Sequence, residues 1–252
     1  MSAETAQSTR NTAGKLGLFL VVVTTVLTAA CTSKPVPVIS NEQLHQHSTA
    51  YIRQAIRADN LSDICQSISH DSNSEAQSLY QQWLEQEWNV IIGADSFYRT
   101  TLSGETLVFD NQILAMEALR LYADETERSS ASFSYLARVK MNPERTCLRK
   151  MRETLAPLAL TEGARTKLVA QAIRHPAPPA RGDRIPSLAG SFTIDATAGR
   201  SLYKIEQSTK NMSCSSPKII TFQNKWPSEI YGIFCNNDHK LVSCDWGQCR
   251  TL

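Results

Sequence analysis

Glycine is scarce in this sequence, at 10 of 252 residues, and no glycine-rich loop occurs. Phosphate-cradling loops and dinucleotide-binding fingerprints need closely spaced glycines, so neither of these nucleotide sites is expected. The Gly-x-Ser-x-Gly and His-Glu-x-x-His patterns of hydrolases and metalloproteases are also missing. We therefore expect a protein that is not an enzyme and that carries no cofactor and no metal ion.

The sequence also lacks a strong net charge and long apolar segments. Its 26 basic and 24 acidic residues give a formal net charge of +2, which is too small to indicate a nucleic-acid partner. Hydrophobic residues make up 42% and charged residues 20%, close to ordinary globular usage. This composition excludes collagen, a highly charged disordered chain and a polytopic membrane protein, and the length suits one large domain or two small ones.

Residues 1–30 have the organisation of a secretory signal peptide. Arg10 and Lys15 precede an apolar stretch over residues 16–28, and the small residues Ala29 and Ala30 follow it. This stretch is shorter than the roughly 20 residues that a membrane-spanning helix needs. A basic start, a short apolar core and small residues before a cleavage point are typical of a signal that is removed on export.

The segment Leu27-Thr28-Ala29-Ala30-Cys31 resembles the lipobox of bacterial lipoproteins, although the family prefers leucine where this chain has Thr28. The resemblance covers residues 1–31 and implies cleavage before Cys31, acylation of the new amino group and lipidation of the thiol. Two or three acyl chains would hold the protein at a membrane, since each buried CH₂ contributes about 0.8 kcal/mol. The alternative is a plain signal peptide or a short anchor with an incidental cysteine.

Thr32 stands where the enteric lipoproteins that stay in the inner membrane have aspartate. The resemblance therefore implies a lipid-anchored protein of the cell outer membrane, facing the periplasm or the surface.

Seven cysteines are an odd number for an exported chain. With Cys31 lipidated, six remain for three disulfides in an oxidising compartment. These six are Cys65, Cys147, Cys214, Cys235, Cys244 and Cys249. We expect Cys65 to pair with Cys147 and the four C-terminal cysteines to pair among themselves. A four-thiolate zinc site made by those four is the alternative, but the spacing from Cys244 to Cys249 is not that of the usual zinc knuckle.

The mature chain divides by pattern into an α-helical part and a β-rich part, so the predicted fold class is α+β. Residues 31–40 form a proline-containing tether, and apolar residues at helical spacing predict a helical domain over 41–174, with one amphipathic helix over 105–127. Four prolines within residues 175–187 predict a linker. Residues 188–252 predict a small disulfide-stapled β-rich region. The predicted strands lie near residues 192–196, 219–222, 230–234 and 241–244.

Charge is unevenly distributed along the chain. Residues 71–127 carry eleven acids and two bases, whereas residues 128–184 carry twelve bases and four acids. Acidic and basic helices could pack against each other, or the two charges could form a two-faced surface that steers a partner. Arg145, Arg149 and Arg152 share one face of a predicted helix and could contact phosphate groups of an anionic partner.

Two further patterns suggest sites. His45 and His47 lie two residues apart without an apparent third metal ligand, so we expect solvated side chains. Trp246 lies between Cys244 and Cys249. A disulfide between these cysteines would place the Trp246 ring on a closed turn, where it could anchor an interface. The alternative is that the ring packs in the core.

Together these features predict a lipid-anchored cell-envelope protein that is a non-enzymatic accessory, scaffold or binding component of an envelope complex. Its expected partners are the membrane, through the lipid on Cys31, and an envelope protein, with no nucleic acid. One alternative is a periplasmic inhibitor or immunity lipoprotein that neutralises a toxin. A further alternative is a periplasmic hydrolase, which would need a solvent-exposed pocket holding a histidine beside a carboxylate and a serine or cysteine.

Overall fold

The computed structural model describes residues 38–68, 70–101, 106–109, 112–159, 162–176, 178–182, 184–185, 197–210, 212, 216–235 and 239–252. The predicted leader, Cys31 and nearly all of the tether lie outside these residues. The described residues belong to one compact unit, Pro37–Leu252. No helix in this part of the chain has the length and apolar character needed to cross a membrane.

Helices come first in the chain and a four-stranded sheet comes last, which confirms the predicted α+β class. The helices are α2 (Asn41–Ile68), α3 (His70–Thr100), α4 (Met116–Phe133), η2 (Leu136–Arg138), α5 (Pro143–Thr154), α6 (Glu162–Ala172) and α7 (Leu202–Thr209). The strands are β1 (Thr106–Phe109), β2 (Gln112–Ala115), β3 (Lys218–Lys225), β4 (Ser228–Phe234), β5 (His239–Asp245) and β6 (Gln248–Thr251).

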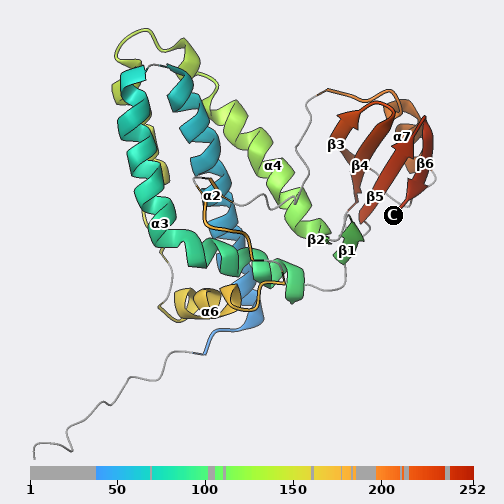
Figure 1. Ribbon diagram of the computed structural model, residues 1–252, viewed down its shortest axis with the longest axis horizontal. Helices are drawn as coiled ribbons and strands as arrows, with labels where there is room; N and C mark the ends of the chain where they lie inside the picture. Colours follow the sequence, from blue (N-terminus) through green and yellow to red (C-terminus); the bar gives the residue numbers. More distant parts are fainter. Residues whose placement is uncertain are drawn as a thin grey trace, which may run out of the picture. The chain divides into compact units, whose positions relative to one another are not determined.

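Helices α2 and α3 lie side by side and antiparallel (Figure 1). The Tyr80 hydroxyl of α3 donates to Asp59 Oδ1 of α2 at 2.8 Å, while Tyr98 near the other end of α3 contacts Thr49 near the start of α2. Apolar residues at helical spacing on both helices are buried in one core, as the pattern predicts.

Helices α5 and α6 complete this core. A disulfide joins Cys65 of α2 to Cys147 of α5, the pairing that we expect from the sequence. Helix α6 approaches α3 at Gly93, where a Cβ atom would lie 1.8 Å from the Leu168 carbonyl oxygen. Only glycine allows the two backbones to lie this close, so Gly93 is required for the packing of α6.

The sheet is antiparallel with strand order β3-β4-β5-β6, and its central strand β4 is buried on both faces. Ile230 and Phe234 share a core with residues of α4, whereas Tyr231 and Ile233 share another with Ile205 of α7. The alternation follows from the two-residue period of a strand. Strands at residues 219–222, 230–234 and 241–244 are confirmed, and the one predicted at 192–196 lies outside the described residues.

The helix predicted over residues 105–127 is wrong in its first half. Strands β1 and β2 pair antiparallel there, with Leu107 opposite Leu114, and α4 begins only at Met116. The run Thr-Leu-Val-Phe favours a strand, and Asp110-Asn111 has turn chemistry. Helix α7 was likewise not expected within the β-rich region.

The zinc alternative is also wrong, because Cys244 and Cys249 form a disulfide that joins β5 to β6. Cys235 is disulfide-bonded too, and Cys214 lies outside the described residues. Every cysteine among the described residues is therefore disulfide-bonded.

The proline-rich segment from residue 175 to 185 has no helix or strand among its described residues, as its composition predicts. It is nevertheless fixed on the helical domain rather than free. Arg184 pairs with Asp59 at 2.7 Å and with Asp63 at 2.6 Å, and the Ile185 N–H donates to the Tyr80 hydroxyl. We call this segment the strap.

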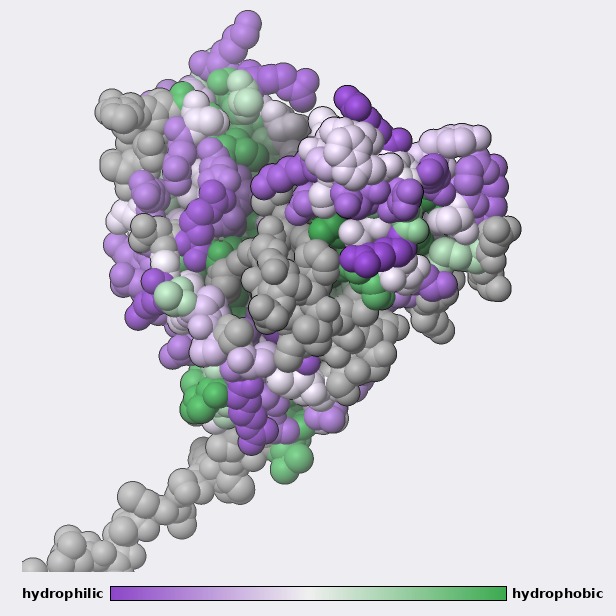
Figure 2. Space-filling model, turned by 45° about the vertical axis from the view of Figure 1, so that its right-hand side comes forward, coloured by the Kyte–Doolittle hydropathy of each residue, from purple (hydrophilic) through white to green (hydrophobic). Residues whose placement is uncertain are grey.

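Opposite charges of the chain pair with each other on the helical domain. Arg152 of α5 donates to Glu75 of α3 at 2.8 Å, and Arg165 of α6 donates to Glu87 of α3 at 2.6 Å. Each pair joins the basic part of the sequence to the acidic part, which favours internal charge complementarity over a two-faced surface. Hydrophilic residues dominate the described surface on the face that Figure 2 shows.

Candidate functional site

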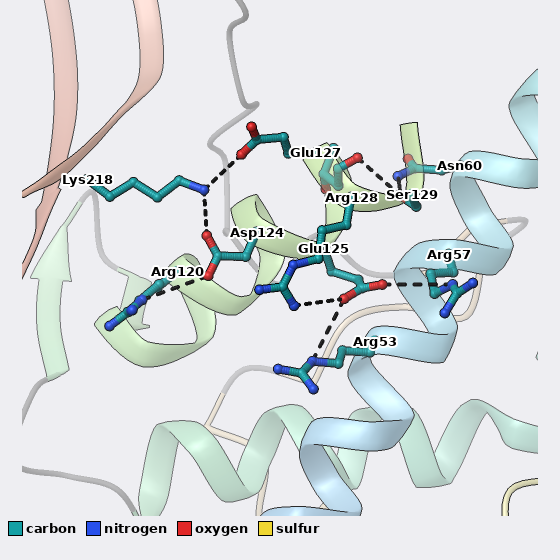
Figure 3. Close-up of polar contacts among 11 residues, drawn as sticks. Arg53, Arg57, Asn60, Arg120, Asp124, Glu125, Glu127, Arg128, Ser129 and Lys218 are labelled. Atoms are coloured by element: carbon teal, nitrogen blue, oxygen red, sulfur yellow. Dashed lines mark hydrogen bonds and ion pairs between the residues drawn. The ribbon is translucent and has the colours of Figure 1, made fainter. Parts of the chain in front are cut away.

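A cluster of arginines surrounds one buried carboxylate between α2 and α4 (Figure 3). Glu125 of α4 has a side chain only 7% exposed. The Nε atoms of Arg53 and Arg57 on α2 each lie 3.8 Å from a Glu125 carboxylate oxygen, and Arg128 Nη1 lies 3.9 Å from it. Three guanidinium groups around one carboxylate leave two positive charges uncompensated.

The helix geometry explains this grouping. Arg53 and Arg57 are four residues apart on α2, so they share the face that packs on α4. Distances of 3.8–3.9 Å are too long for hydrogen bonds, so Glu125 holds the arginines by charge alone. Within the described part of the chain, no hydrogen bond occupies the guanidinium N–H groups of Arg53 or Arg57, and both side chains are 47% exposed.

The same two arginines line a groove with a cavity volume of about 580 Å³, a size typical of small-molecule sites. The end of α4 and the residues after it contribute Phe133 and Tyr135, and α5 contributes Lys150. The Arg57 guanidinium lies 5.8 Å from the centroid of the Phe133 ring, within cation–π range. The groove thus combines cations with an aromatic wall.

Charges on the other side of α4 serve a different purpose. Lys218 of β3 donates to Asp124 Oδ1 at 2.6 Å and to Glu127 Oε2 at 2.8 Å (Figure 3). Partial burial would lower the pKa of Lys218, but these two carboxylates outweigh it and raise the pKa above its ordinary value. The three residues bind β3 to α4 and are not part of the groove.

The second candidate site is a pair of exposed tryptophans in two turns of the sheet. Trp226 lies in the β3–β4 turn and is 43% exposed, and Trp246 lies in the β5–β6 turn and is 69% exposed. Their rings meet edge to face with centroids 5.6 Å apart, and the backbone N–H of Trp246 donates to the Pro227 carbonyl. The core-packing alternative for Trp246 is therefore wrong.

The backbone holds this tryptophan pair firmly. Trp246 has φ of +50°, a left-handed conformation that is uncommon for a bulky residue, and Gly247 follows at +75°. The Cys244–Cys249 disulfide closes the turn, and the Lys204 ammonium donates to the Gly247 carbonyl at 2.7 Å. The Arg200 guanidinium lies 4.7 Å from the Trp226 ring centroid. We call Trp226, Trp246 and these two cations the tryptophan tip.

The His175–Asp95 pair does not meet the requirement of the hydrolase alternative. His175 Nε2 lies 2.7 Å from Asp95 Oδ2, but both side chains are only 3% exposed, so no substrate reaches them. His45 Nε2 lies 2.9 Å from Glu117 Oε1 and links α2 to α4, so His45 is not simply solvated as expected. Among the described residues, no group of three or more His, Cys, Asp or Glu side chains could hold a metal ion.

The three arginines predicted to contact an anionic partner lie together on α5, outside the groove. Arg145, Arg149 and Arg152 are all exposed on α5, but Arg152 is paired with Glu75 and none of the three lines the groove. Arg53 and Arg57 were missed. Their four-residue spacing is visible in the sequence, but nothing there connects it to Phe133 or Lys150.

A buried carboxylate fixes the backbone beside the tryptophan tip. Glu229 of β4 accepts hydrogen bonds from the N–H groups of Arg200 and Ser201 at 2.8 and 2.9 Å, and from the Tyr231 hydroxyl at 2.8 Å. Burial would raise the pKa of Glu229, but these hydrogen bonds outweigh it and hold the pKa below its usual value. Glu229 therefore holds the chain in place just before α7.

We expect Glu229→Gln to lower the free energy of unfolding by about 2 kcal/mol at pH 7, because the amide cannot accept all three hydrogen bonds. Since the folded-state pKa is depressed, the stability due to Glu229 is present above the unfolded-state pKa and is lost as the pH falls through the folded-state value. Urea titrations between pH 7 and pH 3 test this. The variant should lose less stability over that range than the unaltered protein, and equal losses would contradict the assigned role.

Comparison with models of protein families, with known proteins and with solved structures gives no match for this chain, so the geometry described above carries the functional argument.

Proposed function

We propose that this protein is a lipid-anchored, non-enzymatic binding component of the bacterial cell envelope. Its anchor is the lipid on Cys31, and its contact with an envelope protein partner is the tryptophan tip. The observation that carries this proposal is the 69% exposure of Trp246 on a disulfide-closed turn. A large apolar ring held in the solvent by a firm backbone has no role in the core of this chain.

The chemistry of the tryptophan tip suits a protein interface. Tryptophan and arginine are enriched among the residues that dominate binding energy. Both rings are already held in place by backbone bonds and by each other, so little conformational entropy is lost on binding. The cations Arg200 and Lys204 lie at the tip, which favours an acidic contact surface on the partner. Disulfides in both parts of the chain suit an oxidising, exported location.

The experiment is site-specific cross-linking in the cells that make the protein. A photoreactive residue replaces the exposed Gln248 beside the turn, and we expect one dominant adduct with an envelope protein. The partner is then purified and its affinity measured with Trp246→Asn, since asparagine tolerates the left-handed backbone. We expect at least tenfold weaker binding, because interface tryptophans typically cost 2 kcal/mol or more when removed.

Met141→Ala is the matched control, since Met141 is an exposed apolar residue elsewhere on the surface. It should leave the affinity unchanged. Binding by Trp246→Asn at the affinity of the unaltered protein would exclude the tip as the contact. A secreted toxin as the cross-linked partner would replace the proposed role with that of an inhibitor or immunity lipoprotein.

A further inference from the structure

We propose that the groove beside Arg53, Arg57 and Lys150 binds a phosphate group whose attached ring or apolar portion lies against Tyr135. This site lies in the helical domain and does not depend on the tryptophan tip or on the anchor. It is a ligand site rather than a catalytic one.

The unused donors of the arginines are the first argument. The guanidinium group presents N–H donors in a planar fork that matches phosphate oxygens. Arg53 and Arg57 come one helical turn apart on α2, are about half exposed, and donate no hydrogen bond within the described part of the chain. The buried Glu125 carboxylate lies behind them and restrains both side chains without occupying their donors.

The charge of the groove is the second argument. Its lining carries Arg53, Arg57 and Lys150 against a single acid, Glu153, which accepts a hydrogen bond from Lys150 at 2.6 Å. With Glu125 behind the arginines and Arg128 beside it, four cations face two anions. The surplus of two positive charges matches a phosphate monoester better than a single carboxylate. The cations come from two helices, so a phosphate between α2 and α5 contacts both.

The groove is also held open by bonds that a ligand does not have to form. The Gln54 amide nitrogen donates to the carbonyls of Thr154 and Ala156, at 2.8 and 2.7 Å, and fixes the end of α5 against α2. The Cys65–Cys147 disulfide joins the same two helices. A preformed site loses little free energy on ordering when its ligand binds.

The aromatic wall defines the rest of the ligand. Phe133 lies under Arg57, and Tyr135 is partly exposed to the groove. Phe133 is only 3% exposed, so a ring or hydrocarbon attached to the phosphate would cover the Tyr135 ring instead. Small phosphate esters and anionic phospholipid headgroups share this chemistry, and the experiment separates the two sources.

The test is calorimetric titration of the purified full-length protein with phenyl phosphate, inorganic phosphate and phenol. We expect saturable binding of phenyl phosphate, weaker binding of inorganic phosphate by about threefold to tenfold, and still weaker binding of phenol. Arg53→Gln with Arg57→Gln should weaken phenyl phosphate binding at least tenfold. Lys150→Gln leaves the surroundings of Glu125 intact and should weaken it severalfold, even where the arginine variants fold poorly.

The matched control is Arg145→Gln with Arg149→Gln, which removes two exposed arginines with the same four-residue spacing on α5. It should leave the affinity unchanged. An equal loss in this control, or no binding of phenyl phosphate at millimolar concentration, would overturn the proposal.

Vesicle sedimentation with the unlipidated chain from Thr32 onward, which lacks the apolar leader, separates the sources. Binding to phosphatidylglycerol but not phosphatidylcholine, lost with the Arg53 and Arg57 changes, identifies a phospholipid headgroup. Binding of phenyl phosphate without vesicle binding identifies a small phosphate ester.

Discussion

Replacing both Cys65 and Cys147 with alanine is expected to lower the free energy of unfolding by about 4–5 kcal/mol. Their disulfide spans a sequence separation of 82, and the entropy that such a bond removes from the unfolded chain rises with the logarithm of the loop length. A typical domain is stable by only about 5–15 kcal/mol. Urea titration followed by far-ultraviolet circular dichroism should therefore show a large fall in the transition midpoint.

The second disulfide supplies the control for this prediction. Cys244 and Cys249 have a sequence separation of 5, so replacing both with alanine is expected to cost about 2 kcal/mol by the same relation. Reduction of the unaltered protein breaks both of these bonds and the bond of Cys235, so its loss of stability should be at least as large as that of either double variant. Equal costs for the two pairs would mean that local packing, and not loop length, sets the contribution of each bond.

Changing Cys31 to serine is expected to move the protein from the membrane fraction to the soluble fraction and to abolish labelling by radioactive palmitate. The thiol is the proposed attachment point for the acyl chains, so the variant lacks the anchor that the lipoprotein resemblance implies. The measurement is fractionation in high salt, which removes proteins held only by charge.

Thr32→Asp is the companion variant. It should keep the palmitate label but move the protein to the inner membrane, as the lipoprotein resemblance implies. Persistence of the Cys31→Ser protein in salt-washed membranes after removal of the leader would refute the lipid anchor. The proposed phosphate groove would stand, because it lies wholly in the helical domain.

Much of the fold follows from local patterns in the sequence. Pro143 sits at the first turn of α5, and the helix ends at Thr154, before Pro157. The short apolar run from Ile230 to Phe234 predicts β4, because successive side chains of a strand point to opposite faces and both faces of β4 are buried. The Cys65–Cys147 pairing follows from the separation of these cysteines from the other four.

Other features depend on contacts that a local pattern does not contain. Leu107, Ile113 and Leu114 fit a helical period as well as a strand, so the β1–β2 hairpin could not be separated from the start of α4. Composition alone predicts a linker at the strap, since prolines break regular structure whether the segment is free or bound. Its attachment depends on Arg184 meeting Asp59, which lies 125 residues away in the sequence.

The candidate sites show the same division. The tryptophan tip was suggested by the position of Trp246 between two cysteines, although the contribution of Trp226 was not. The groove joins Arg57 to Phe133 and Lys150, three residues from separate helices. No short sequence pattern spans such distances, so the groove appears only once the helices are assembled.

Helix α4 takes part in two hydrophobic cores. Ala118 and Leu121 are buried with α2 and α3, whereas Met116 and Leu119 are buried with the sheet. Loss of either core would expose apolar surface of α4 to water and so destabilise the other core as well. The prolines near the strap suggest a domain boundary in the sequence, but the two sides of that boundary do not unfold independently. The helices and the sheet should therefore melt in a single cooperative transition.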